Sequence, residues 1–447
     1  MRQISAFLLA AAFAITSAQA QVAAPPVAVT PAPPFSPNIT ITGARASGLY
    51  AVGENVSWTV RQPLGMPGAR YTYEVRENNL AVLSSGALDL SSGMAVVSGA
   101  LPRPGMITLV LKPVQAANAP APNVTGPVQA AISAAAAIGI RDIRPASPRP
   151  ADFKAFWDGK LAALRAIPLR ADLTPVESGR AGVTLSTIVI DSVGSKVQGY
   201  LARPDRDGKY PALVIYQYAG VYALEKETAV NRAAEGWLAF NVDSHDMPPT
   251  EATAPRNYAS LGNNDRDSSY FLNMYLRDVR AIDFIRSNPH WDGKTIVIMG
   301  TSMGGQQSYA VAGLVPGITA MLVNVPAGAN IVGDRFGQRA GYPNWTTSEA
   351  AIAATGPYFD SMSFAPEVTA ASVVAFGLLD VTSPPYGVIA AFNAIAGPKE
   401  MVPMVESDHN HITPQKQEGW LVRSRDVLEQ LRTTGRFTVN TSWDRQK

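Results

Sequence analysis

The chain has 447 residues, of which 47% are hydrophobic and 16% charged, and its formal net charge at pH 7 is +2. The length exceeds the usual size of one domain and the composition suits a large core, so we expect a globular protein of two domains. A net charge this close to zero gives no electrostatic basis for binding nucleic acid or an anionic membrane surface. The absence of cysteine excludes a thiol nucleophile, disulfides and cysteine-ligated zinc.

The first twenty residues have the pattern of a secretory signal peptide. Arg2 supplies a positive start, residues 7–15 form a short apolar run, and Ala18-Gln19-Ala20 has the small residues of a cleavage site. The apolar run is much shorter than the roughly 20 residues that span a bilayer. We therefore expect an exported protein, periplasmic or secreted, that is cleaved after Ala20 and has no membrane anchor. Residues 21–35 are rich in Pro and Ala and indicate a leader.

Residues 36–115 predict a small all-β domain. Segments rich in β-branched and aromatic residues, such as "VSWTV" and "GMITLVLKP", alternate with Gly, Pro and Asn, and no helical period appears. The pattern is typical of a β-sandwich of immunoglobulin-like size. Its aromatic residues are more typical of a sandwich core than of a sugar-binding surface, so we expect a spacer or interaction module; they include Tyr50, Trp58, Tyr71 and Tyr73.

Helices and strands alternate over residues 149–447, after a segment of low complexity at 116–148 that predicts a linker with a short helix in its alanine run. Apolar residues at intervals of three and four predict helices from Phe153 and over Ser269–Arg286, and continuous apolar runs such as "YPALVIYQY" predict buried strands. This alternation predicts an α/β fold: a mainly parallel sheet, flanked by helices, with its active site at the carboxyl ends of the strands.

A G-x-S-x-G motif spans Gly300-Thr301-Ser302-Met303-Gly304. It follows the β-branched run "TIVIM" and precedes "GGQQSYAVAGL", which has helical character. A serine at a tight turn between a strand and a helix is the context of the nucleophile elbow of α/β-hydrolases. Backbone N–H groups at the helix start favour a developing oxyanion. The alternative, an ordinary serine in a Gly-rich turn, is disfavoured by this context.

A serine hydroxyl needs a base to act as a nucleophile, and in this fold the histidine follows the serine in the chain. His245 and His290 precede Ser302, so only His409 and His411 remain as candidates. Both follow the strand-like segment "MVPMVES". The residue pattern alone does not separate these two histidines.

The acid of such a site comes between the serine and the histidine, at the end of a strand. Asp380 directly follows the apolar run "VVAFGLL" and precedes the turn "VTSPP". Asp334 and Asp360 lie in irregular segments, where we expect a surface role. The sequence therefore favours Asp380.

Residues from about 146 to 425 resemble the acetyl xylan esterase/cephalosporin-C deacetylase group, carbohydrate esterase family seven. The segments that carry the resemblance are "RPADFKAFWDGKLAALRAIPL", "VQGYLARP", "MYLRDVRAIDFI" and "GLLDVTSPPYGVIAAFNAIAGPKEM". The last one places the acid of the family at Asp380. The family register over "SDHNH" puts the base at His411 and a variable aromatic position at His409. The resemblance thus implies two-step acyl transfer by Ser302, Asp380 and His411, without a cofactor.

The resemblance also implies an oxyanion hole and a pocket. One donor would be the N–H of Met303, which stands where the family has Gln. The His-Gly-Tyr motif of the family falls on Gln217-Tyr218-Ala219, which makes Ala219 the second donor and places Gln217 and Tyr218 at the pocket. The Arg-Gly-Gln motif falls on Asp243-Ser244-His245, so His245 is also a pocket candidate. We expect no metal at "DSHD" because ligands packed so closely are rarely all usable.

These observations predict an exported serine esterase that hydrolyses acetyl or other short-chain esters, with acetylated carbohydrate such as xylan as its substrate. Because a fold does not fix a substrate, a serine peptidase or a broad-specificity carboxylesterase remains an alternative. A noncatalytic binding protein on a hydrolase scaffold is the alternative from another class, and the intact order of Ser302, Asp380 and His411 argues against it. Relatives in the family assemble as ring-like multimers, so the resemblance implies a homo-oligomer, which the added N-terminal domain could block or reshape.

Overall fold

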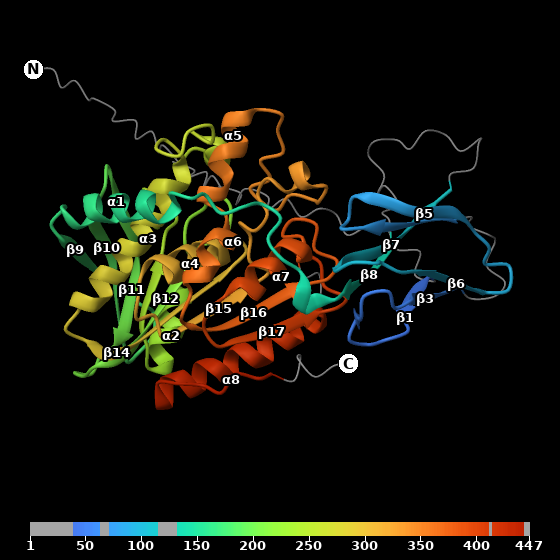
Figure 1. The fold of residues 1–447 in the computed structure, drawn as a ribbon. Coiled ribbons are helices and arrows are strands. Elements are labelled where there is room, and N and C mark those ends of the chain that lie inside the picture. Colours follow the sequence, from blue (N-terminus) through green and yellow to red (C-terminus); the bar gives the residue numbers. More distant parts are fainter. Residues whose placement is uncertain (1–38, 63–70, 115–131, 411–413, 442–447) are drawn as a thin grey trace, which may run out of the picture.

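The computed structural model describes residues 39–62, 71–114, 132–410 and 414–441 (Figure 1). The predicted signal peptide and leader lie outside the described residues, and so does His411. Among the helices of these ranges, none is both long and apolar enough to cross a membrane. Figure 1 shows a group of β-strands on one side of the molecule and a larger helix-covered sheet on the other.

The N-terminal strands form two sheets that share a core. One sheet has the order β1-β3-β6 and the other the order β2-β8-β7-β4-β5. Trp58 and Tyr71 are only 2% exposed in the core between the sheets, as expected for sandwich aromatics. The immunoglobulin-like assignment stays a prediction. The strands are β1 Thr40–Gly43, β2 Leu49–Tyr50, β3 Val56–Arg61, β4 Tyr71–Glu77, β5 Ala81–Leu88, β6 Met94–Gly99, β7 Gly105–Pro113 and β8 Ile132–Ile138.

The alanine run that predicts a linker with a short helix is instead strand β8, so this prediction is wrong. It pairs antiparallel with β7 along its whole length and parallel with β2 at its end. Ala136 and Ile138 belong to the core between the two sheets, whereas Ala135 and Ala137 belong to the core of the larger domain. Residues on both faces of β8 therefore contribute to a hydrophobic core, and the pairing with β7 and β2 keeps the backbone extended. This tertiary setting overrides the helix propensity of alanine.

The C-terminal part is built on a nine-stranded sheet with the order β17-β16-β15-β14-β12-β13-β11-β10-β9. The six neighbouring strands β17, β16, β15, β14, β12 and β13 pair in parallel. Strands β11, β10 and β9 extend the sheet beyond β13 with antiparallel pairings. The strands are β9 Ala171–Val176, β10 Val183–Ser192, β11 Ser195–Pro204, β12 Tyr210–Tyr216, β13 Leu238–Val242, β14 Trp291–Thr301, β15 Ala320–Asn324, β16 Ala371–Gly377 and β17 Lys399–Met404.

Helices cover both faces of this sheet (Figure 1). Helices α2 and α8 share one core cluster with one face of the sheet, and α1, α3, α4, α6 and α7 share another cluster with the opposite face. The α/β prediction is confirmed, and the helices predicted from Phe153 and over Ser269–Arg286 are α1 and α3. The helices are α1 Phe153–Arg165, α2 Glu227–Glu235, α3 Tyr270–Ser287, α4 Met303–Leu314, α5 Ala350–Thr355, α6 Ser361–Phe364, α7 Pro385–Ala394 and α8 Glu418–Thr434.

The two parts of the molecule meet beside the edge strand β17. At Gly48, where φ is +65°, an added Cβ would lie 2.8 Å from Leu378 Cδ1 and 3.3 Å from Val405 Cγ1. Glycine is therefore required twice over, by the backbone conformation and by the close approach. The N-terminal sheets thus contact the segments that follow β16 and β17.

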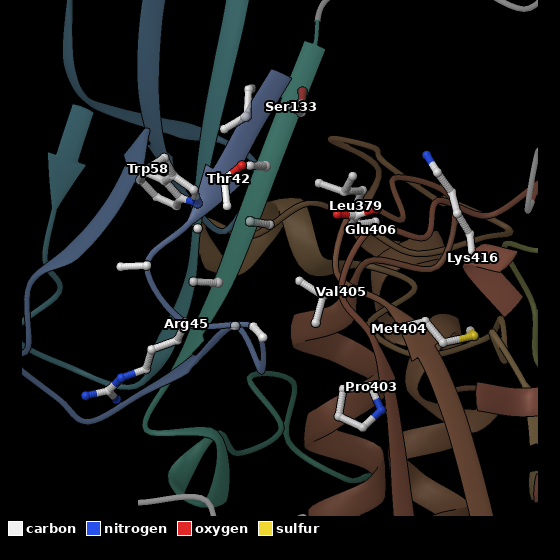
Figure 2. A pocket seen from close by; sticks show the side chains of 18 of the residues that line it. Thr42, Arg45, Trp58, Ser133, Leu379, Pro403, Met404, Val405, Glu406 and Lys416 are labelled. Carbon is white, nitrogen blue, oxygen red and sulfur yellow. The ribbon is translucent and has the colours of Figure 1, made fainter. Parts of the chain in front are cut away.

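A cavity of about 1100 Å³ lies between the two parts (Figure 2). Strands β1 and β8 line one side, and Leu379 with the segment 403–406 lines the other. Among the described residues at its wall, the aromatic side chains are Tyr50 and Trp58, which are 7% and 2% exposed. The cavity therefore offers no open aromatic face on which a sugar ring would stack.

Candidate active site

Ser302 occupies a tight turn between β14 and α4. Its φ and ψ are 55° and −120°, a region that non-glycine residues rarely adopt and that is concentrated at functional sites. A Cβ at Gly300 would lie 2.3 Å from the carbonyl carbon of Gly304, and a Cβ at Gly304 would lie 2.3 Å from the backbone oxygen of Tyr216. The small residues of the motif are therefore needed for the turn to close. The predicted strand–turn–helix arrangement is confirmed.

Backbone hydrogen bonds hold the turn in place. The N–H of Ser302 donates to the carbonyl oxygen of Asn324, at 3.0 Å. The carbonyl oxygen of Ser302 accepts from the N–H groups of Gly305, Gln306 and Ala327. The strained backbone of Ser302, a residue that is 7% exposed, is thus fixed by its neighbours, and its side chain takes no part in these bonds.

His409 bridges Ser302 and Asp380. Its Nε2 lies 2.9 Å from Ser302 Oγ, and its Nδ1 lies 2.8 Å from Asp380 Oδ2. A carboxylate can only accept, so the neutral ring carries its proton on Nδ1 and leaves Nε2 to accept from the serine hydroxyl. Asp380 is fully buried, and its other oxygen accepts from the N–H groups of Thr382 and Ser383 at 2.8 and 2.7 Å.

The preference for His411 as the base, with His409 as its neighbour, is corrected by this geometry. The loop after β17 is anchored because the N–H of Ser407 donates to Met404 and the carbonyl oxygen of Ser407 accepts from the N–H of Leu379. These bonds fix the register of the following residues. One ring, that of His409, then reaches both the serine and the acid, while His411 lies outside the described residues.

Asp380 stands where the sequence predicts the acid, and Asp360 does not have the surface role that we expected. Asp360 is 1% exposed and accepts from the N–H groups of Met362 and Ile331, at 2.9 and 2.8 Å. Burial raises its pKa to about 6. Its carboxyl group caps the short helix α6 and ties it to the loop at Ile331, which is a structural role.

The family model of acetyl xylan esterase matches residues 136–331 and 340–423. The chain belongs to the acetyl xylan esterase family. The acetyl esterase Axe7A of Xylanibacter ruminicola is 28% identical over an alignment of 386 residues, and the match covers 81% of this chain and 85% of that protein.

Two solved structures support the same assignment of the fold. An acetyl xylan esterase from Paenibacillus sp. R4 is 26% identical with a TM-score of 0.56, over 64% of this chain and 98% of that one. Acetyl xylan esterase 1 from Thermoanaerobacterium sp. JW/SL YS485 shares the fold at 20% identity and a TM-score of 0.54, over 64% of this chain and 96% of that one. The family membership makes this chain a carboxylic-ester hydrolase.

In this acetyl xylan esterase family member, the two predicted oxyanion donors lie on neighbouring elements. Met303 is the first residue of α4, and the first N–H groups of a helix have no acceptor within it. Ala219 lies in the loop after β12, which pairs with β14 up to Tyr216 and Gly300. The start of α4 and the end of β12 are thus side by side. The assignment of both donors stays a prediction.

Of the three pocket candidates in the esterase, two are buried. Gln217 is 3% exposed, its side-chain oxygen accepts from the N–H of Ser244 at 2.9 Å, and its carbonyl oxygen accepts from the side chain of Gln307 at 2.9 Å. His245 is fully buried. The hydrogen bonds of both side chains support the loops around β12 and β13, and their role at the pocket stays a prediction. Tyr218 is 54% exposed and stacks on Tyr222, and its pocket role stays a prediction.

Both ring nitrogens of His245 have partners. Nε2 lies 2.9 Å from the carbonyl oxygen of Gly220, and Nδ1 lies 2.8 Å from the hydroxyl of Tyr270. Burial lowers the pKa of His245 to about 4, and burial raises that of the nearby Asp243 to about 8. Both shifts favour the uncharged forms of these groups. Neither nitrogen of His245 is available as a metal ligand.

Sequence reasoning missed Tyr258 and Tyr342, which lie next to the site of the esterase. Tyr258 begins a short 3₁₀ helix, Tyr258–Ser260, and Tyr342 lies in a loop. Their hydroxyls are 2.7 Å apart, and the hydroxyl of Tyr342 lies 3.8 Å from Met303 Sδ. No periodicity or motif marks either residue. Only the folded chain brings them to the elbow.

Proposed function

We propose that this carboxylic-ester hydrolase cleaves acetyl or other short-chain esters through an acyl-enzyme on Ser302, with acetylated xylan or another acetylated carbohydrate as its substrate. The observation that carries the proposal is the series of hydrogen bonds from Ser302 through His409 to Asp380 at the elbow. The names of the relatives favour an acetyl ester. The pattern of the first twenty residues supports export.

Each side chain has one role in the proposed reaction. His409 Nε2 takes the proton of Ser302 Oγ while that oxygen attacks the ester carbonyl carbon. Asp380 keeps the ring in the required tautomer and stabilises the imidazolium that forms. His409 then gives the proton to the leaving alcohol. In the second step His409 takes a proton from water, which attacks the acyl-enzyme, and the carboxylic acid leaves as Ser302 regains its proton.

The negative charge that develops on the carbonyl oxygen needs donors that are already in place. The N–H groups of Met303 and Ala219 are the proposed donors. Each donor of this kind is worth about 10²–10³ in kcat. The mechanism therefore depends on the loop after β12 as well as on the three side chains.

An ester panel tests the function. The purified protein should release acetate from a chromogenic acetyl ester and from acetylated xylan, and should act less on esters of longer acids and on peptides. Ser302→Ala should lower the rate by at least about 10³-fold because it removes the nucleophile. Activity that survives this substitution would reject the acyl-enzyme. A preference for longer acyl chains or for peptides would favour a broad carboxylesterase or a peptidase instead.

A further inference from the structure

The loop that carries Ala219 is held through both backbone polar groups of one residue, Gly220. The N–H of Gly220 donates to the hydroxyl of Tyr258 at 2.9 Å, and its carbonyl oxygen lies 2.9 Å from His245 Nε2. The φ of Gly220 is +126°, in the region that favours glycine. The peptide groups on both sides of Gly220 are therefore fixed in orientation. One of them contains the carbonyl group of Ala219, so the chain is held directly after the proposed donor.

The chemistry of His245 allows one arrangement of protons at this anchor. A carbonyl oxygen only accepts, so Nε2 carries the proton and donates to Gly220. Nδ1 is then an acceptor, and the hydroxyl of Tyr270, at 2.8 Å, donates to it. Because burial lowers the pKa of His245, the ring keeps this neutral form at neutral pH.

The second anchor of Gly220 leads on to the nucleophile elbow. The hydroxyl of Tyr258 accepts from Gly220, and it lies 2.7 Å from the hydroxyl of Tyr342, which lies 3.8 Å from Met303 Sδ. A thioether is only an acceptor, so Tyr342 donates to Met303 and Tyr258 donates to Tyr342. Burial raises the pKa of both tyrosines, so both hydroxyls keep their protons.

Tyr342 is also bonded to the acid side of the site. Its N–H donates to the carbonyl oxygen of Thr382 at 2.8 Å, and its own carbonyl oxygen accepts from Gly328. Thr382 is in turn one of the two residues whose N–H groups bind Asp380. Tyr342 is therefore fixed relative to the acid, and its hydroxyl is a stable end point for the bonds that run to Gly220.

We propose that Tyr258 and Tyr342 are positioning residues for ester hydrolysis, which hold the loop of Ala219 in alignment with Met303. In this arrangement the two backbone N–H groups converge on the carbonyl oxygen of the ester before it becomes an oxyanion. The inference rests on the proposed function, since it takes Ala219 as the second donor. Donors that are aligned in advance stabilise the transition state without reorganisation, and a misplacement of about 1 Å can cost about 10²-fold in rate.

Hydroxyl deletion tests the proposal. Tyr258→Phe and Tyr342→Phe keep the rings, including the contact of Tyr258 with His245 at a centroid distance of 4.7 Å, and remove one hydroxyl each. We expect kcat for a chromogenic acetyl ester to fall about 10–100-fold, with KM nearly unchanged. Inhibition by a small boronic acid, whose adduct with the serine is tetrahedral, should weaken by a similar factor. The pH profile of kcat/KM should not move, because His409 and Asp380 are untouched.

The matched control is Tyr210→Phe. Its hydroxyl donates to the carbonyl oxygen of Arg206 at 2.7 Å, at the opposite end of the strand that leads to Ala219. This variant also loses one tyrosine hydroxyl bond, and its kcat should equal that of the wild type. The double variant of Tyr258 and Tyr342 should be no slower than the slower single variant, since either change breaks the same series of bonds.

Three results would overturn the positioning role. They are a wild-type kcat in both single variants, a loss that appears in KM or in the pH profile, or losses that multiply in the double variant. Melting temperatures show whether each variant is folded. If Tyr258→Phe does not fold, Tyr342→Phe alone tests the proposal. An inactive wild-type protein would instead reject the proposed function, so the two failures are distinguishable.

Discussion

The same side chain, histidine, serves two opposite purposes within a short distance of the elbow. His245 is fully buried, with both ring nitrogens bonded to structural partners and its pKa lowered to about 4. His409 is partly exposed and places one nitrogen on the nucleophile. Burial and partners, not residue type, thus decide which histidine can exchange protons with a substrate.

His409→Ala and His411→Ala should have very different effects on activity. The first removes the group that bonds both Ser302 and Asp380, so kcat should fall by at least about 10³-fold. The second should stay close to the wild type. Kinetics on a chromogenic acetyl ester, with melting curves to confirm folding, measure both. A large loss of activity in His411→Ala together with a mild loss in His409→Ala would instead assign the catalytic base to His411.

Ser302 and Asp380 were predictable from the sequence, and His409 was not. Ser302 directly follows β14 and Asp380 lies shortly after the end of β16, and the apolar runs of both strands are visible in the chain. His409 lies in a loop whose register depends on Ser407. The carbonyl oxygen of Ser407 accepts from the N–H of Leu379, and a Cβ added at Gly377 would lie 2.2 Å from the same oxygen. Contacts between distant segments have no local signature, so a short motif could not decide between two histidines.

At the scale of elements, the elbow depends on how closely α4 approaches β12. The helix begins against the end of the strand because Gly304 has no side chain. Strand β8 also depends on its packing partners, since its alanines contribute to two cores. In both cases the neighbouring element determines the local structure. The sequence predicts that structure only where a motif already implies a close neighbour, as the glycines of the G-x-S-x-G motif do.

Gly304→Ala should damage the enzyme, whereas Gly159→Ala should stabilise it. The new Cβ at position 304 would lie 2.3 Å from the oxygen of Tyr216, so α4 must shift, at a cost of about 1–3 kcal/mol in stability. The accompanying displacement of Ser302 should lower kcat by about 10²-fold. Gly159 lies within α1 with nothing within 4 Å of its Cβ position, and alanine there should add about 0.5–1 kcal/mol. Equal effects of the two substitutions on stability would contradict this account of the elbow.

At the scale of the whole molecule, the segment between the two parts is tied to the larger one by Asn393 of α7. Its side-chain amide donates to the carbonyl oxygens of Ile140 and Ile143, at 2.8 and 2.9 Å. Ile143 is 1% exposed, so its carbonyl group has little access to water if the amide is removed. The N-terminal sheets are thus fixed to the larger domain by specific bonds as well as by packing.

Asn393→Ala should lower the free energy of unfolding by about 1–3 kcal/mol, because it removes the amide donor of two carbonyl oxygens; that of Ile140 belongs to a buried residue, and that of Ile143 keeps only its bond from Arg144. The kcat of the folded variant should not change, since Asn393 touches neither the elbow nor the acid turn. Denaturant unfolding measures the first effect. The control Asn231→Ala removes an exposed hydrogen bond to Arg180 and should cost less than about 0.5 kcal/mol. An effect of Asn393→Ala as small as that of the control would show that packing alone holds the segment.

The spacing of the site residues along the chain has a consequence for how the enzyme acquires its activity. Ser302 and His409 are 107 positions apart, and His409 and Asp380 are 29 apart. Their strands join the sheet through parallel pairings that close long loops, which is the slow kind of contact to form. A folding intermediate that contains only the turn at Ser302 would hold the serine but lack the histidine that activates it. The appearance of esterase activity during refolding therefore reports the last stage of sheet assembly, later than the gain of helical signal.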